Sequence, residues 1–238
     1  MTSGRGRLLS MAETRRNRRR KGQELIEFSL TALLLAGLLV SSFITGMNLI
    51  RSIQVNQVSR DMADMYIHGA DFSTYSMQQL AQRLAQGLNL QIGSSFSGNS
   101  AANTGNQGNV LVTLSQVMYI GSATDPNCAS VGASHCTNAN SFVFTQRIQF
   151  GNGSLAATKP SSLGNPATAS VSSAGVIASP VTDAGARLPS AAQTSFGRLW
   201  QTPLQDGQVC YVAELYAQSP DLNLGSFLGG GVYARSFF

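Results

Sequence analysis

The 238-residue sequence has few charged side chains, histidines and cysteines, and each shortage narrows the chemistry open to the protein. Charged residues make up 11% of the chain, whereas about a quarter is usual in soluble proteins. Neither of the two histidines lies near an evident nucleophile and orienting acid. The three cysteines lack the Cys-x-x-Cys spacing of structural zinc sites, and no glycine-rich phosphate loop follows a predicted strand. The sequence therefore predicts no cofactor and favours a protein that is not an enzyme.

The net charge of +5 is concentrated at the N-terminus. Residues 1–22 hold eight Lys/Arg and one acid, 8 − 1 = +7, and the remaining 216 residues hold 8 bases and 10 acids, 8 − 10 = −2. Binding of nucleic acid requires a basic patch or stripe, which the larger part of the chain does not offer. The basic residues therefore indicate a leader, and we expect no nucleic-acid partner.

An uncharged, mostly apolar run of 23 residues follows the basic segment, from Phe28 to Ile50. As an α-helix it would span roughly 34 Å, enough for a bilayer core of about 30 Å. The excess of Lys/Arg before it predicts a cytoplasmic N-terminus and an exported C-terminal part, anchored in the inner (cytoplasmic) membrane by a single pass. The run is too long for a cleaved secretory signal and has no convincing Ala-x-Ala site. Two interpretations remain: an uncleaved signal anchor, or a leader that is cleaved before the apolar run.

Glu27 stands just inside this apolar segment, where a carboxylate is costly unless it reaches the interface or meets a cationic partner. The surrounding residues are Gly22-Gln23-Glu24-Leu25-Ile26-Glu27-Phe28, directly behind Arg18-Arg19-Arg20-Lys21. This arrangement resembles a type IV prepilin leader. More closely it resembles the TadE/TadF-type pseudopilins of tight-adherence (Flp) pili, whose short motif is a Gly, four residues, then a Glu followed by an aromatic residue. The resemblance extends to about residue 70.

The resemblance implies cleavage between Gly22 and Gln23 by a membrane-embedded prepilin peptidase on the cytoplasmic side. It also implies that Glu27, with Phe28, sets the register of subunits in the membrane, where Glu27 could pair with the free α-amino group of a cleaved neighbouring copy. Expected partners are the peptidase, other pilin-like subunits and the pilus assembly platform. The expected function is structural, in the assembly of a cell-surface pilus. Two alternatives stay open: an uncleaved signal-anchored surface-binding protein, and a membrane-tethered hydrolase.

The predicted fold class is α+β, with one long N-terminal helix (a transmembrane half and an amphipathic half), a second short helix, and an antiparallel β-sheet domain with long loops. Gly69 is a plausible C-cap of the long helix, which predicts its end near residue 68. The expected organisation is a basic cytoplasmic leader at 1–22, a transmembrane helix at 23–50, an extracytoplasmic helical region at 51–92, a Gly/Asn/Ser-rich linker at 93–109 and an extracytoplasmic β-rich domain at 110–238.

Periodicity predicts which faces of the two helices are buried. The packed face of the long helix is expected to carry Ile50, Ile53, Val58, Met62 and Met65. A second helix is predicted at about 74–89, with Met77, Leu80, Ala81, Leu84 and Leu88 buried and its Gln side chains, Gln78 among them, facing outward. Strands are predicted at 110–120, 141–150, 208–216 and 231–238, with an irregular surface excursion at 151–200.

Cys128 and Cys136 flank a short loop in the part of the chain predicted to be exported. A disulfide is favoured in an oxidising compartment. The competing interpretation uses Cys128, His135 and Cys136 as metal ligands, one fewer than a structural zinc site needs. Cys210 is predicted to be a buried thiol, although another pairing stays open. Scattered acids such as Asp206 and Glu214 are expected to serve in turns.

Overall fold

The computed structural model describes residues 5–88, 90–93, 98–105, 107–167, 170–199, 204–218 and 231–238, with side chains described from residue 24 onward. The side chains of the predicted basic leader therefore lie outside the described part, as do residues 94–97 and 106 of the predicted linker. The chain divides into two compact units, Met1–Leu49 and Ile50–Phe238. The second unit contains both the predicted helical region and the predicted β-rich domain, which are thus one body.

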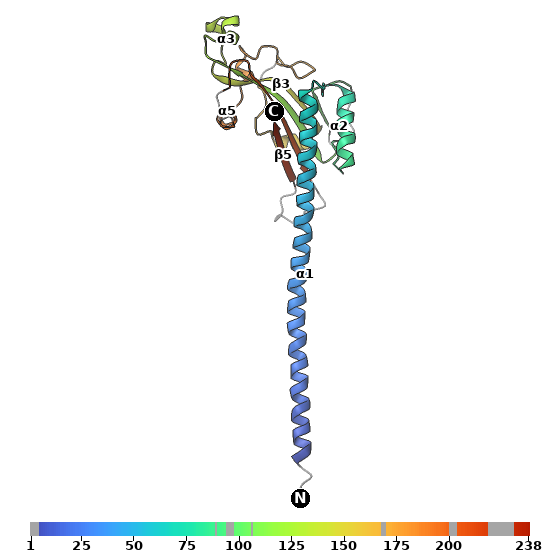
Figure 1. Cartoon of the computed structure of the whole chain (residues 1–238). Helices are drawn as coiled ribbons and strands as arrows, with labels where there is room; N and C mark the ends of the chain where they lie inside the picture. Colours follow the sequence, from blue (N-terminus) through green and yellow to red (C-terminus); the bar gives the residue numbers. More distant parts are fainter. Residues whose placement is uncertain are drawn as a thin grey trace. The chain divides into compact units, whose positions relative to one another are not determined.

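One long helix begins in the first unit and continues into the second, where shorter helices and five strands follow it along the chain (Figure 1). In chain order the elements are α1 (Arg5–Ile67), α2 (Tyr75–Gly87), β1 (Ala102–Gly105), β2 (Val110–Ile120), α3 (Pro126–Val131), the 3₁₀ turn η1 (Ala133–His135), β3 (Ser141–Asn152), α4 (Gly153–Thr158), the 3₁₀ turn η2 (Ala184–Ala186), α5 (Ser190–Gly197), β4 (Val209–Gln218) and β5 (Gly231–Phe237). The α+β class predicted from the sequence is confirmed.

Helix α1 ends in a Schellman motif at the predicted place. Gly69 has φ +85°, the left-handed conformation that glycine adopts without a Cβ penalty. The N–H of Ala70 donates to the carbonyl of Met65 at 3.0 Å, and the N–H of Gly69 donates to that of Tyr66 at 3.1 Å. These two bonds satisfy carbonyls that the last turn would otherwise leave open.

The five strands form one sheet in the order β1-β3-β2-β4-β5. The pairings β2–β3, β2–β4 and β4–β5 are antiparallel, as predicted, but β1 pairs with β3 in parallel. The sheet is therefore mixed, and residues 102–105 of the predicted linker form a strand. Their sequence, Ala-Asn-Thr-Gly, has no alternation of apolar and polar residues, so it does not predict a strand. The extended conformation is stabilised by pairing with the neighbouring strand β3.

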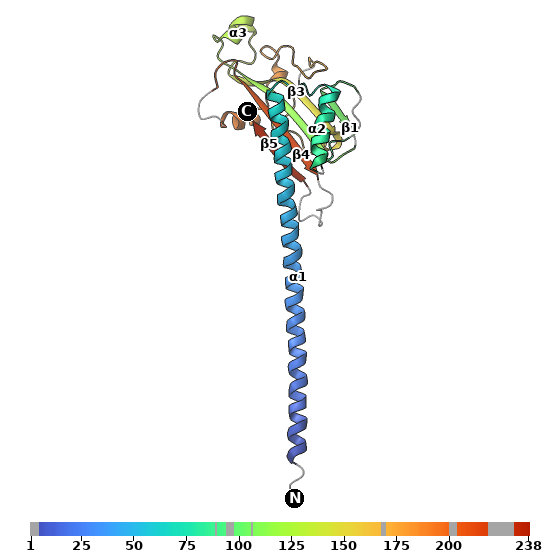
Figure 2. The ribbon, with the colours of Figure 1, turned by 45° about the vertical axis from the view of Figure 1, so that its right-hand side comes forward.

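One face of the sheet packs against α2 and the C-terminal part of α1, which lie side by side across it (Figures 1 and 2). The core between them is nearly free of solvent. Its largest fully buried side chains include Phe72, Phe150, Met62, Leu90 and Leu114. Phe72 stacks on Phe150 with ring centroids 6.0 Å apart, which joins the α1–α2 connection to strand β3.

The buried faces of both helices differ in part from those that periodicity predicts. On α1, Val58 and Met62 are buried as expected, whereas Ile50 and Ile53 are more than half exposed. On α2, Gln78 and Ala81 are fully buried, whereas Leu80 and Leu84 are about 40% exposed. Gln78 is buried because its amide is satisfied: Nε2 donates to the carbonyls of Phe72 and Ser100, and Oε1 accepts from Asn103. An amide whose hydrogen bonds are all satisfied can occupy a buried position on a helix that the apolar pattern assigns to a leucine.

The other face of the sheet carries a second core at one end. It contains Leu163, Ile177, Leu188 and Phe196, which belong to the segment predicted as an irregular surface excursion. Residues 151–200 are therefore in part a covering layer, with the short helices α4 and α5 within it. Because both faces of the sheet are covered, successive residues Val212, Ala213, Glu214 and Leu215 of β4 are all buried.

Candidate functional site

The N-terminal unit contains the apolar part of α1, whose side chains are mostly exposed, with Ile44 buried. Within α1, the segment Glu24–Ile67 is long and apolar enough to cross a membrane. Side chains such as Phe28, Leu33 and Leu39 are between 65% and 77% exposed. A core helix of a soluble domain would be mostly buried, so the exposure agrees with a lipid-facing helix.

Polar groups of this segment lie almost entirely on one side of the helix. With successive residues turned by about 100°, all polar side chains from Phe28 to Ile50 except Ser29 fall within about 60° of Glu27: Thr31, Ser41, Ser42, Thr45 and Asn48. Thr31 Oγ1 donates to the carbonyl of Glu27, and Thr45 Oγ1 to that of Ser41, both at 2.8 Å. Such internal bonds lower the cost of hydroxyls in hydrocarbon, so the side of α1 that carries Glu27 is suited to contact another helix.

The four residues of the predicted leader motif all lie on α1. The backbone of Gly22 and Gln23 is helical, and their side-chain environment lies outside the described part. Glu27 and Phe28 are both exposed. A Cβ built at Gly37 or Gly46 meets nothing within 4 Å, so the helix surface is open at these positions.

A buried charged cluster lies on the far face of the sheet, away from α1. Arg147 of β3 and Glu214 of β4 have side chains 6% and 3% exposed, with Nη1 3.8 Å from Oε2. Glu214 also accepts hydrogen bonds from Ser161 Oγ, from the backbone N–H and Oγ of Ser162, and from Tyr233 OH. These hydrogen bonds hold Ser161 and Ser162, which follow α4, against strand β4 in the sheet.

Arg147 makes three hydrogen bonds from its terminal nitrogens. Nη1 donates to Ser115 Oγ at 2.5 Å, and Nη2 donates to the carbonyl of Gly164 at 2.8 Å and to Asn165 Oδ1 at 2.9 Å. Burial lowers the pKa of Arg147 to about 10, opposed by the charge of Glu214, so the guanidinium stays charged at neutral pH. Burial and the same carboxylate raise the pKa of Tyr233 above its ordinary value.

This cluster is better suited to holding the fold together than to catalysis. The Glu214 side chain is 3% exposed and accepts four hydrogen bonds, so its oxygens are occupied and closed to a substrate. Glu214 lies in the middle of β4, within the strand predicted at 208–216, and does not have the turn role expected of the scattered acids. The sequence signal for this buried charge is a single acid within a strand whose other residues are apolar at both odd and even positions. Such a strand is covered on both faces of the sheet, so its acid must have a buried partner.

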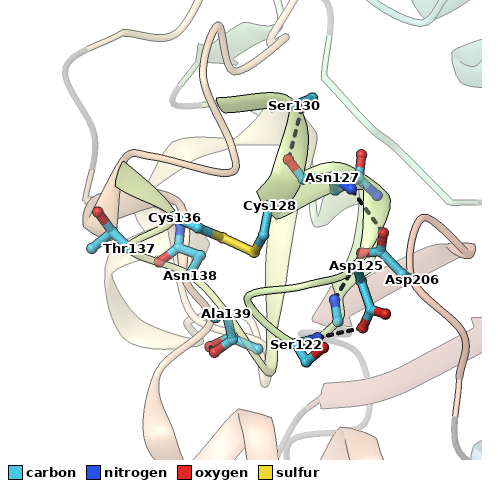
Figure 3. Close-up of a disulfide and its surroundings, with 12 residues drawn as sticks. Ser122, Asp125, Asn127, Cys128, Ser130, Cys136, Thr137, Asn138, Ala139 and Asp206 are labelled. Atoms are coloured by element: carbon cyan, nitrogen blue, oxygen red, sulfur yellow. Dashed lines mark hydrogen bonds between the residues drawn. A yellow bond between two sulfur atoms is a disulfide. The ribbon is translucent and has the colours of Figure 1, made fainter. Parts of the chain in front are cut away.

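The predicted bond between Cys128 and Cys136 is present, with Cα atoms 5.1 Å apart, and it closes the loop of α3 and η1 (Figure 3). The competing metal site is thereby excluded in this state, because both sulfur atoms are bonded to each other. Among the described residues no three His, Cys, Asp or Glu side chains are grouped as a metal site. Cys210 is a buried free thiol, as predicted, and burial raises its pKa to about 11.

Asp206 holds the start of the disulfide loop from a distant point in the sequence (Figure 3). Its carboxylate accepts the N–H of Gly121 at 2.8 Å and that of Asn127, in the first turn of α3, at 2.9 Å. Burial acts to raise the pKa of Asp206, but these N–H donors outweigh it and lower the pKa below its ordinary value. Asp206 lies in a turn, as predicted, and acts there as a helix cap for another segment.

Comparison of the chain with protein-family models, with curated proteins and with solved structures found no match.

Proposed function

We propose that this chain is a TadE/TadF-like pseudopilin, a structural subunit that takes part in the assembly of a tight-adherence type IV-like pilus. The observation that carries the proposal is the position of Glu27. It stands five residues after Gly22, behind the basic leader, and on the side of α1 that carries most of the polar residues of an otherwise apolar and mostly exposed segment. A plain membrane anchor has no need of an acid at that depth.

Cleavage after Gly22 would create a positive α-amino group on Gln23. In the low dielectric of the membrane, this group on one chain and Glu27 on a neighbouring chain would attract strongly and fix their register. Ser41, Ser42 and Thr45 lie on the same side of α1, and their small side chains would allow neighbouring helices to approach closely. The partners proposed are a prepilin peptidase, other pilin-like subunits and the assembly platform.

The proposed location is a single pass through the inner membrane, with the N-terminus cytoplasmic and the Ile50–Phe238 unit extracytoplasmic, from where it enters the pilus. Two observations support this orientation: the net charge of +7 on residues 1–22, and the disulfide in the second unit. The chemistry of the Arg147–Glu214 cluster supports a structural role over a hydrolytic one.

The N-terminus of the protein in its native membrane tests the proposal. We expect intact-mass measurement to find a chain that begins at Gln23. Replacing Gly22 with Phe should leave the basic leader in place, because a bulky side chain would block the cleavage site. The matched control Gly6→Phe, elsewhere in the leader, should still be cleaved. A wild-type chain that keeps its leader would refute the proposal and favour an uncleaved, signal-anchored surface-binding protein.

A further inference from the structure

A groove runs along one flank of the second unit, beside strand β5. Two adjoining hollows of about 450 and 440 Å³ share Asn56 and Arg60 of α1. The first is completed by other residues of α1 and the second by the end of β5. We name the two together the β5 groove, with the lining residues Ile53, Asn56, Gln57, Arg60, Asp61, Arg235, Ser236, Phe237 and Phe238.

Strand β5 is an edge strand, and its outer backbone groups have no backbone partner in the part of the chain that the structure describes. Tyr211 and Phe238 exchange both of their N–H···O bonds, at 2.9 and 3.0 Å. In an antiparallel ladder such pairs alternate with pairs whose N–H and C=O point away from the partner strand. The N–H and C=O groups of Tyr233, Arg235 and Phe237 therefore point outward, and no backbone hydrogen bond within the described residues reaches them. An open edge of this kind is a template for another strand.

The opposite edge of the sheet is protected in a way that β5 is not. Strand β1 has only four residues. Ser100 Oγ accepts the N–H of Ala102 at 3.2 Å and donates to its carbonyl at 3.3 Å, which occupies one outward pair. The β1 edge of the sheet is thus short and partly capped, whereas the β5 edge is longer, has outward groups that are unpaired within the described ranges, and adjoins the groove.

The groove presents a cation without a partner. Arg60 forms no ion pair or hydrogen bond with another residue of the described ranges. Asn56 donates its amide to the carbonyl of Ser52, which leaves its side-chain oxygen as an acceptor. An extended peptide with a carboxylate opposite Arg60 would complement these groups.

We propose that the β5 groove binds an extended segment of a different polypeptide, which adds to the sheet beside β5 and places a carboxylate against Arg60. The backbone of the segment would bond to Tyr233, Arg235 and Phe237, and its side chains on one face would rest on the exposed flank of α1 at Ile53 and Asn56.

Photo-crosslinking of the full chain in its native membrane tests this proposal. A photoreactive amino acid is placed at Asn56, with Leu84 of α2 as the control position, and crosslinked peptides are sequenced. We expect Asn56, but not Leu84, to crosslink to an acid-containing segment of another protein. A synthetic peptide of that segment should bind the purified chain. Crosslinks between copies of this chain, or none at Asn56, would overturn the proposal.

Two matched variant pairs then test the strand addition and the charge. Both Arg235→Pro and Arg235→Ala remove the arginine side chain, but only the Pro variant also loses the outward-pointing backbone N–H. The hydrogen bonds that join β5 to β4 come from the neighbouring residues Ala234 and Ser236, so neither change removes them. We expect crosslinking at Asn56 to fall at least tenfold in the Pro variant relative to the Ala variant, with thermal unfolding showing that both fold. Arg60→Glu should lose crosslinking that Arg60→Lys retains. Equal yields within either pair would contradict the proposal.

The same samples separate this proposal from the pilin assignment. The mass of the N-terminus reports leader cleavage independently of the groove. A cleaved chain without the crosslink refutes the groove alone, and an uncleaved chain with the crosslink refutes the pseudopilin assignment alone.

Discussion

Arg147 and Glu214 come from strands that do not pair with each other, yet their side chains meet across the intervening strand β2, 3.8 Å apart and shielded from solvent. Ser115 of β2 lies between them in the sheet and accepts a hydrogen bond from Arg147. Taking two charges out of water is costly, and this cost is offset by further hydrogen bonds, here from Ser161, Ser162 and Tyr233 to Glu214, whereas the buried Nε of Arg147 has no partner among the described residues.

Replacing Arg147 with Met should therefore destabilise the second unit strongly. The change leaves Glu214 buried without its counter-charge, which costs about 3–5 kcal/mol. For a unit of this size the loss corresponds to a decrease in Tm on the order of 10 °C, measured by circular dichroism of the full chain in detergent.

The exposed ion pair of His68 with Asp64 provides the control, since its side chains are 74% and 68% exposed. His68→Ala should change the free energy of unfolding by less than about 1 kcal/mol. A double variant Arg147→Met/Glu214→Gln should lose less than the sum of its single changes. If Arg147→Met were as mild as His68→Ala, the buried pair would not stabilise the fold.

Replacing Glu27 with Ala should spare membrane insertion and leader removal but impair assembly. Insertion depends on the apolar run and cleavage on Gly22, whereas only the pairing with a neighbouring α-amino group uses the carboxylate. Glu24→Ala, three residues earlier on the same helix, is the matched control. Pilus production is measured by electron microscopy and the N-terminus by mass. Normal pili in the Glu27→Ala strain would refute the role given to this residue.

Asp206→Asn should destabilise the second unit by about 1 kcal/mol at neutral pH, because one of the two oxygens that accept the N–H groups of Gly121 and Asn127 is replaced by an NH₂ group, which cannot accept. The folded-state pKa of Asp206 is lowered, so its contribution is fully present above the unfolded value of about 3.9 and is lost as the pH falls through the folded value. Chemical unfolding of both proteins between pH 7 and pH 2.5 measures the difference. A gap that stays constant down to pH 2.5 would show that the charge is not involved.

Removal of the disulfide, in Cys128→Ser/Cys136→Ser, should cost about 2–3 kcal/mol by the chain-entropy relation for a short loop. Dithiothreitol should lower the Tm of the wild type to that of the double variant and should leave the variant unchanged. A wild-type Tm insensitive to the reductant, with the bond shown to be reduced, would mean that the cross-link adds no stability.

Long, regular elements were predictable from the sequence because local patterns determine them. The end of α1 near Gly69 follows from one glycine, and strands β2 and β3 follow from runs of Val, Phe and Ile. Elements whose conformation depends on distant neighbours were missed. Strand β1 is extended only because β3 lies beside it, and Gln78 is buried only because three backbone or side-chain partners converge on it.

The same limit applies to the candidate sites. Gly22, Gln23, Glu27 and Phe28 form a local motif that is visible in seven residues, and the Cys128–Cys136 bond spans a short loop. Arg147 and Glu214 are far apart in the sequence, and no spacing indicates that they meet. The β5 groove combines the flank of α1 with the last strand of the sheet, so it exists only in the folded chain.

The cysteine arrangement has a consequence for the order of events during export. If the chain crosses the membrane from its N-terminal to its C-terminal end, Cys128 and Cys136 emerge together, while Cys210 is still on the cytoplasmic side. Closing a loop of eight residues is far faster than waiting for a distant third thiol. Cys210 then folds into β4 as a buried thiol with a pKa of about 11, too rarely ionised to attack the finished bond. If the chain is exported as proposed, its correct pairing would thus be achieved by timing, without a need for later reshuffling.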